Sequence, residues 1–360
     1  MKSSSGAHYE GLDHLRALAA FLVVLWHFSR PAVNTSIAAT PEIGLIAQGH
    51  SGVALFMTLS GYLFAKLVGQ RTIDFPAFAW NRALRLLPLF ILCLLLGYLV
   101  QSPEDRAAYL HGVKVGWLLP GMPQGGWSIV VEMHFYLLLP MILWSVRRWR
   151  YAPLLIVGAA LLLRLALANL GYAIETLAYY TLIGRIDQFA LGIFAYHLAP
   201  RGRVAAAAFG ALWLFYMWFA ANGGYYGAHD DLVWVVLPTI EAAGFAALIS
   251  WYDRHPFTGR WTAPLRRAGD YSYAVYLLHF LTVVAASRFV DDNLARLTSV
   301  YVAIPFALVY FGYMTMLGWA SHRLIEGPMM RFRRPYLKDA PAASAANDAT
   351  DKSEARQLAA

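Results

Sequence analysis

Apolar stretches of about 20 residues recur along most of the chain, and short polar segments separate them. Stretches of this length cross the hydrocarbon core of a bilayer as helices, and the alternating pattern of a membrane β-barrel is absent. The pattern therefore predicts an all-α, polytopic integral membrane protein with about ten transmembrane helices. The predicted spans are 12–32, 51–68, 84–101, 127–146, 152–170, 180–198, 204–221, 233–251, 271–289 and 299–320.

Composition agrees with this class, because 59% of the 360 residues are hydrophobic and only 14% are charged. The first span is predicted to be a transmembrane helix and not a cleaved signal peptide, since an acidic and basic cluster precedes its apolar run and no small-residue cleavage site follows it. A Gly-Pro pair at 327–328 reads as the stop of the final helix. From Asp339 onward the chain cannot bury a core. We predict a transmembrane domain over 1–338 and a disordered cytoplasmic tail over 339–360.

The distribution of positive charge predicts which side the termini face. An even number of spans places both termini on one side, and most of the 29 Lys and Arg residues fall on that side. The positive-inside rule therefore predicts that both termini are cytoplasmic. The net charge of +8 has the same explanation, so no nucleic-acid partner is expected. The sequence shows no dinucleotide fingerprint, P-loop or zinc-ligand spacing, and no metal is expected.

Two ionisable residues share one stripe of the first span. Arg16 and His27 are about three helical turns apart, a rise of about 16 Å, so His27 lies near the midplane if Arg16 lies at the surface. An ionisable group at that depth is by default a functional candidate. An imidazole can take a proton from a hydroxyl, and a guanidinium binds phosphate or carboxylate. A structural histidine remains an open alternative, and Asp13 could simply hold Arg16.

Glu132 is an acid inside the apolar run of the fourth span, so it requires a partner. A salt-bridged structural glutamate and a catalytic one fit this pattern equally. His279 lies about 13 Å inside its own span, close to the expected depth of His27. The candidate partners of Glu132 are His27, His279, Arg164 and Arg185.

Arg82 and Arg85 lie one helical turn apart at the cytoplasmic start of the third span. Arginines at such a position are typically positive-inside residues that contact lipid phosphate. The alternative is a phosphate clamp for an anionic cofactor that approaches from the cytoplasm.

In their number, order and spacing, five stretches of about residues 9–335 resemble the acyltransferase 3 family of integral-membrane acyltransferases. Arg16 and His27 fit the arginine and histidine of the family's first-helix pattern, although His14 stands where a glycine is usual. In the second stretch, GHSGVALFMTLSGYLF, Ser60 and Gly61 match a Ser-Gly motif. FAWNRALRLLP resembles the family's arginine-rich entry to the third helix. WSIVVEMHFYLLLP and GDYSYAVYLLH resemble its Trp-Ser…Glu…Phe-Tyr motif and its late Ser-Tyr…His motif.

The resemblance implies a membrane-bound O-acyltransferase. Family members move an acyl group, usually acetyl, from cytoplasmic acyl-CoA to a hydroxyl of a cell-surface polysaccharide, a lipopolysaccharide sugar or a lipid-linked glycan. We therefore expect acetyl-CoA or another acyl-CoA as donor, a glycan or lipid-linked sugar as acceptor, and contact with membrane lipid in a bacterial-type cytoplasmic (inner) membrane. The extra extracytoplasmic hydrolase-like domain of some members is not expected in this chain.

The chemistry of these residues leads to a hypothesis about their individual roles. His27 is expected to act as the general base on the acceptor hydroxyl, and a transient acyl-histidine is a second route. Glu132 is expected to orient or charge-balance His27, and His279 is a further candidate for the same catalytic group. The residues expected to bind the donor are Arg16, Arg82, Arg85 and Ser60.

Two other functional classes compete with this hypothesis. A proton-coupled transporter or exporter of a polar or anionic small molecule also places ionisable residues near the midplane. A membrane receptor or scaffold has no obvious use for them. The sequence shows no internal repeat, and its broken-helix pattern is weak, which favours the enzyme over the transporter.

Overall fold

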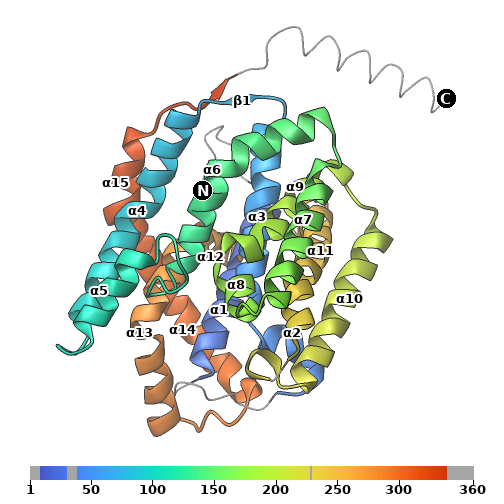
Figure 1. Ribbon diagram of the computed structural model, residues 1–360. Coiled ribbons are helices and arrows are strands. Elements are labelled where there is room, and N and C mark those ends of the chain that lie inside the picture. The colour runs from blue at the N-terminus through green and yellow to red at the C-terminus, as the bar shows by residue number, and fades with distance from the viewer. Residues whose placement is uncertain (1–8, 31–38, 228, 339–360) are drawn as a thin grey trace.

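The computed structural model describes residues 9–30, 39–227 and 229–338, and this part of the chain is almost entirely helical (Figure 1). Nine of the helices in these residues are long and apolar enough to cross a membrane. The predicted all-α, polytopic membrane fold is therefore confirmed. The predicted disordered tail, 339–360, lies outside the described residues.

The nine helices correspond to nine of the predicted spans. They are α1 (Glu10–Phe28), α3 (Ser51–Val68), α4 (Phe75–Leu99), α6 (Trp127–Arg148), α7 (Ala152–Asn169), α10 (Gly202–Ala221), α11 (Asp231–Arg254), α13 (Ser272–Asn293) and α14 (Val300–Ser321) with its continuation to Phe332. The remaining predicted span, 180–198, corresponds to the shorter helix α9 (Leu182–Leu198), which has 17 residues. The other helical elements before residue 300 are α2 (Gly44–Ala47), α5 (Arg106–Val115), α8 (Ile174–Tyr180), α12 (Ala263–Asp270) and the 3₁₀ turns η1 (Pro41–Ile43), η2 (Gly224–Tyr226) and η3 (Arg260–Thr262).

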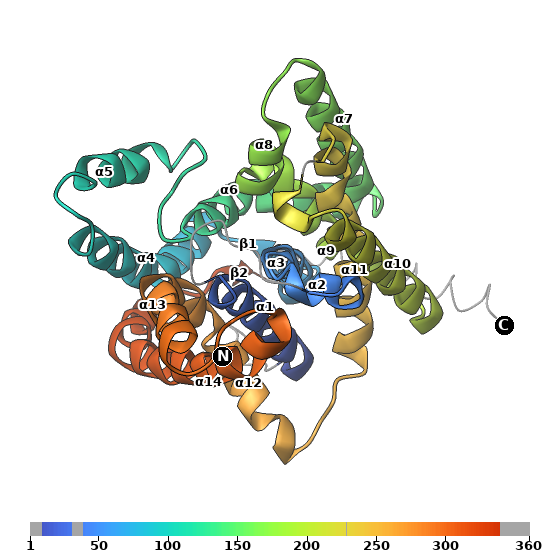
Figure 2. The same cartoon turned by 90° about the horizontal axis from the view of Figure 1, so that it is seen from below.

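Helices α1 and α3 occupy the centre of the bundle, as Figure 2 shows. Helix α3 packs on α9 and α11, while α1 packs on α12, α13 and α14. In the most apolar 18-residue stretch of α1 and of α3, 78% of the residues are buried, whereas the corresponding share is 22% in α7 and in α10. The two central helices are thus shielded from lipid, so they can carry polar side chains into the interior of the bundle.

The start of α4 and the end of the final helix differ most from the prediction. Helix α4 begins at Phe75 rather than near 84, because the Asp74 side chain accepts a hydrogen bond from the Ala77 backbone N–H (3.2 Å) and Pro76 fills the first turn. The final helix does not stop at Pro328. It continues through the π-helical turn η4 (His322–Glu326), α15 (Gly327–Met329) and η5 (Met330–Phe332). Pro328 is tolerated because it lies in the first turn of α15, where its missing N–H is not needed.

Beyond η5 the chain turns back along the start of α4. It reaches β2 (Leu337–Lys338), which pairs antiparallel with β1 (Thr72–Ile73). We call residues 327–338 the C-terminal strap. It begins with α15, and Figure 1 shows it beside α4. The strap therefore brings a segment from the far end of the sequence next to the arginine-rich start of α4.

Candidate active site

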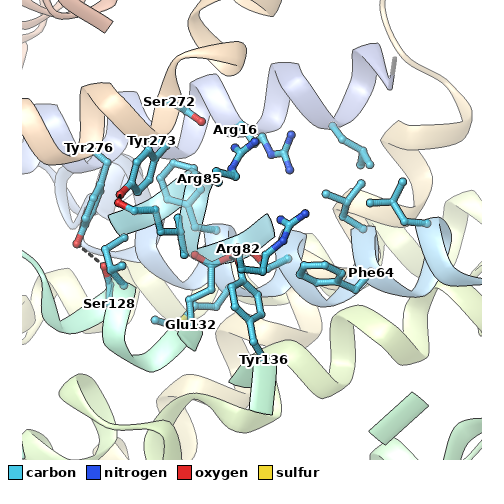
Figure 3. Close-up of a pocket in the computed structure, with 18 of the residues that line it drawn as sticks. Arg16, Phe64, Arg82, Arg85, Ser128, Glu132, Tyr136, Ser272, Tyr273 and Tyr276 are labelled. Carbon is cyan, nitrogen blue, oxygen red and sulfur yellow. Dashed lines mark hydrogen bonds between the residues drawn. The ribbon is translucent and has the colours of Figure 1, made fainter. Parts of the chain in front are cut away.

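A cavity opens between α1, α3, α4, α6 and α13 (Figure 3). The C-terminal strap also forms part of its wall. The cavity encloses about 1250 Å³, counting the part that is open to solvent. Five of the residues predicted from the sequence line this cavity: Arg16, Ser60, Arg82, Arg85 and Glu132. The fold thus gathers in one place side chains that four different helices supply.

Three arginines give the cavity a positive wall. Arg16 extends from α1, and Arg82 and Arg85 extend from α4; Figure 3 shows Arg16 and Arg82 pointing into the same space. Arg16 also forms the ion pair with Asp13 that the sequence suggested as an alternative (3.1 Å). The guanidinium carbon of Arg82 lies 5.3 Å from the centre of the Phe64 ring. Half-buried guanidinium groups gathered in this way favour a ligand with several negative charges, such as a set of phosphates.

Among the described residues, Glu132 is held by hydroxyl groups rather than by a cation. Its Oε1 accepts hydrogen bonds from the Ser60 hydroxyl (3.0 Å) and from the Tyr136 hydroxyl (2.5 Å). Ser60 belongs to α3 and Tyr136 to the next turn of α6, so the acid joins two helices at the cavity wall. Tyr136 is the tyrosine of the Trp-Ser…Glu…Phe-Tyr motif, but it is not among the predicted site residues, although it lies one turn after Glu132 on the same face of the helix.

The cations expected as partners of Glu132 are engaged elsewhere. Arg164 pairs with Asp187 (2.8 Å) and Arg185 pairs with Glu241 (3.2 Å), and all four side chains are buried. None of the four lines the cavity; the two pairs join α7, α9 and α11. Of the four candidate partners of Glu132, these two arginines are therefore excluded. Each buried guanidinium already has its own carboxylate, which is what makes its burial tolerable.

Hydroxyl groups also line the end of the cavity nearest His27. The Ser128 hydroxyl donates to the Tyr276 hydroxyl (2.8 Å), which donates to the Gly125 carbonyl (3.0 Å). Figure 3 shows the Ser128–Tyr276 contact as a dashed line. The Tyr276 ring also packs on Phe280 (5.6 Å between ring centres), and Phe280 packs on His27 (4.7 Å). These two aromatic rings connect the cavity wall to His27.

His27 and His279 lie next to each other, outside the cavity lining. Nδ1 of His27 is 3.3 Å from Nε2 of His279. Each Nδ1 also faces a backbone carbonyl of its own helix, that of Val23 (2.9 Å) for His27 and that of Val275 (3.2 Å) for His279. A carbonyl only accepts, so we assign the proton of each neutral ring to Nδ1. Nε2 of His279 is then an acceptor, and Nε2 of His27 keeps a lone pair that can take a proton. No hydrogen bond joins Glu132 to either histidine in the described part of the chain.

Residues 9–323 match the model of the acyltransferase 3 family, which is described as an acyltransferase domain. The chain belongs to the acyltransferase 3 family. It is therefore an acyltransferase, as the resemblance predicted, rather than the transporter or receptor that competed with this hypothesis. Its apolar helices and its family together identify a multi-pass membrane protein.

Three relatives illustrate the range of the family. BcsY of Komagataeibacter xylinus, whose name describes a membrane-bound transacylase, is 29% identical over 77% of this chain and 73% of its own length. The O-acetyltransferase OatA of Staphylococcus aureus is 23% identical over 92% of this chain, which spans only 58% of OatA. The exopolysaccharide production protein ExoZ of Rhizobium meliloti is 27% identical over 79% of this chain and 90% of ExoZ. No solved structure matches this chain at a significant level.

Proposed function

We propose that this acyltransferase moves an acetyl or other acyl group from cytoplasmic acyl-CoA to a hydroxyl of a cell-surface polysaccharide or lipid-linked sugar. It acts, in this proposal, in a bacterial-type cytoplasmic (inner) membrane. The names of OatA and ExoZ support O-acetyl transfer and a polysaccharide product by analogy. The observation that carries the proposal is the arginine-lined cavity, whose inner end approaches a pair of histidines inside the bundle.

The donor phosphates are assigned to Arg16, Arg82 and Arg85. Acyl-CoA carries several phosphate charges, and a guanidinium fork can give two parallel hydrogen bonds to the oxygens of one phosphate. In the predicted topology these arginines lie on the cytoplasmic side, from which the donor arrives. Ser60 and Glu132 line the wall beyond them, along which the pantetheine arm would extend toward His27.

His27 is assigned as the general base. Its Nε2 takes the proton of the acceptor hydroxyl while the hydroxyl oxygen attacks the carbonyl carbon of the thioester. The C–S bond then breaks, the acyl group stays on the acceptor oxygen, and the CoA thiolate takes the proton from His27. The Nδ1–H of His27 is shared between the Val23 carbonyl (2.9 Å) and Nε2 of His279 (3.3 Å), and this second acceptor helps to stabilise the protonated ring.

A second route uses the same nitrogen as a nucleophile. Nε2 of His27 would attack the thioester, release the CoA thiolate and hold the acyl group until the acceptor oxygen takes it. Rapid quenching of the protein with acetyl-CoA but without acceptor, followed by peptide mass spectrometry, separates the two routes. An acetylated His27 peptide supports the second route, and an unmodified one supports general-base transfer.

Glu132 is still assigned to the catalytic group, but its proposed contact is with the substrate and not with His27. Both of its hydrogen bonds end on Oε1, and within the described residues Oε2 accepts none. Because Glu132 lines the cavity, Oε2 can accept a hydrogen bond from a substrate N–H or O–H. The amide groups of the pantetheine arm and the acceptor hydroxyl are the donors of this kind that the proposed substrates supply.

Mass spectrometry of surface glycans tests the proposed function. We would compare cells that carry the wild-type protein, no protein, and the His27→Ala variant. An acetyl-sized mass that is present only with the wild type is expected. If no glycan differs while immunoblotting shows the protein in the membrane, a surface glycan is not the acceptor. Purified protein should release more than one equivalent of free CoA from acetyl-CoA only when an acceptor is present, because an acyl-histidine without acceptor would release at most one.

A further inference from the structure

The C-terminal strap lies outside the matched family region, which ends at residue 323, yet it is tied firmly to the start of α4. The buried side chain of Asn81 donates to the Arg334 carbonyl (2.7 Å) and accepts from the Arg334 backbone N–H (2.9 Å). Trp80 Nε1 donates to the Phe332 carbonyl (3.0 Å). These three bonds fix the strap backbone on both sides of residue 333.

The end of the strap is anchored as well. The Tyr336 side chain is buried, and its ring lies 5.5 Å from that of Phe78. Its carbonyl accepts a hydrogen bond from the Asp74 backbone N–H (2.8 Å). The Lys338 ammonium lies 2.8 Å from the Asp74 carboxylate and lowers the pKa of that carboxyl, so the pair stays charged near neutral pH. The strap is therefore a fixed wall and not a loose end.

Three of the strap residues line the cavity: Met330, Arg333 and Tyr336. The neighbouring arginines have other positions, because Arg334 lies over the Trp80 ring at 5.5 Å and Arg331 does not line the cavity. Within the described residues, the Arg333 side chain forms no hydrogen bond or ion pair. It is an exposed cation at the cavity with its donors still available.

The depth of Arg333 follows from the strap contacts. Arg334 is paired with Asn81, which lies one helical turn before Arg85 on α4. Arg333 is therefore at the mouth of the cavity, while Arg85 and Arg16 lie further in. If the thioester end of the donor points toward His27, the opposite end of the donor meets Arg333.

We propose that Arg333 forms a separate phosphate subsite, which binds the 3′-phosphate at the nucleotide end of acyl-CoA. This inference rests on the proposed function, because it takes acyl-CoA as the donor. The pyrophosphate group, which is closer to the thioester, is left to the inner arginines. Because Asp13 already offsets part of the charge of Arg16, a further cation at the mouth helps to balance the charge of the donor phosphates.

Direct binding to the purified full-length protein in nanodiscs tests this subsite. The probes are acetyl-CoA and acetyl-dephospho-CoA, which lacks only the 3′-phosphate, and titration calorimetry measures each dissociation constant. Arg333→Ala should weaken acetyl-CoA binding about tenfold or more, since it removes a charge-assisted phosphate contact. It should change the affinity for acetyl-dephospho-CoA less than about twofold. The matched control, Arg331→Ala, removes an exposed arginine of the same strap and should bind both probes like the wild type.

Each other outcome overturns a specific statement. If Arg333→Ala weakened the binding of both probes equally, Arg333 would contact the pyrophosphate or would attract the donor only through its positive charge. Wild-type affinities in that variant would remove Arg333 from the donor site. If the folded wild type binds neither probe, the proposed acyl-CoA donor fails, which is distinct from a failure of the subsite alone.

Two further variants separate a direct contact from a structural effect. Arg333→Lys keeps the charge but loses the fork, so it should recover only part of the affinity for acetyl-CoA. Asn81→Ala should loosen the strap and weaken acetyl-CoA binding. The double variant Asn81→Ala/Arg333→Ala should bind no more weakly than Arg333→Ala, because the strap position acts through that side chain. Fully additive losses would show that Asn81 does not act through Arg333.

Discussion

The Nδ1 atom of His27 lies 3.3 Å from the Nε2 atom of His279, although the two residues are 252 positions apart. The contact joins α1 to α13, so packing of the bundle creates it. His279 is fully buried, and its own Nδ1 faces the Val275 carbonyl (3.2 Å), which fixes the ring. His279 is thus a positioning residue for His27 in the proposed reaction, by the same logic that second-layer acceptors orient a catalytic imidazole.

Replacement of His279 tests this role. His279→Phe keeps a ring of similar size in the buried position but removes the acceptor beside His27. We expect kcat to fall about 10- to 100-fold with little change in the donor KM, because His279 does not line the cavity. His279→Gln, whose amide oxygen can accept from Nδ1–H, should recover part of kcat. A wild-type kcat in folded His279→Phe would remove His279 from the reaction.

Arg16→Ala should show the opposite kinetic pattern. A lost phosphate contact is a loss of binding, so the KM for acyl-CoA should rise about tenfold or more while kcat changes little. The control is Arg148→Ala, which removes an exposed arginine at the end of α6 that lies outside the cavity. Steady-state kinetics over a range of donor concentrations measures both. If the donor KM of Arg16→Ala stays at the wild-type value, the structural pairing with Asp13 is the whole role of Arg16.

Glu132→Gln separates the charge of this residue from its hydrogen bonds. The amide oxygen can replace Oε1 as the acceptor of the Ser60 and Tyr136 hydroxyls, so we expect thermal stability close to that of the wild type. The second carboxylate oxygen becomes an NH₂ group, which can no longer accept from a substrate. We therefore expect kcat to fall about 100-fold. Turnover at the wild-type rate would show that Glu132 only joins α3 to α6.

The membrane fold could be predicted because length and apolarity are local properties of the sequence. The predicted span 51–68 coincides with α3 (Ser51–Val68). Helix α9 shows the limit of this approach, since it is short and carries Arg185 and Asp187. Its place in the bundle depends on carboxylate and guanidinium partners on α11 and α7, and the sequence pattern does not contain these distant contacts.

The candidate site was predictable in its residue types but not in its contacts. A spacing of residues gives the face and depth of a side chain on its own helix, which is why Arg16 and Glu132 could be chosen. It does not give the neighbour on another helix, so the contact of Ser60 with Glu132 and that of His27 with His279 emerge only from the fold. Arg333 was not predicted as a site residue for a further reason. The Gly-Pro pair suggested that the helix ended, whereas the chain continues into the C-terminal strap.

The loop before α6 offers a test of the aromatic connection between the cavity and His27. Gly125 has φ +65°, and a Cβ there would lie 2.1 Å from the Phe280 ring, which packs on His27. Gly125→Ala should therefore displace Phe280 and lower kcat at least about tenfold. Gly121 is the matched control, because it also has a positive φ (+122°), but an added Cβ would have no atom of residues 9–30, 39–227 or 229–338 within 4 Å.

Both alanine variants should lose some thermal stability, since each forces a side chain into a left-handed backbone conformation. Only Gly125→Ala should also lose kcat, because only its new methyl group meets Phe280. Melting temperatures in detergent and acetyl transfer rates at saturating donor measure the two effects separately. Equal losses of kcat in the two variants would assign the effect to the loop backbone. That result would show that the contact with Phe280 does not control the position of His27.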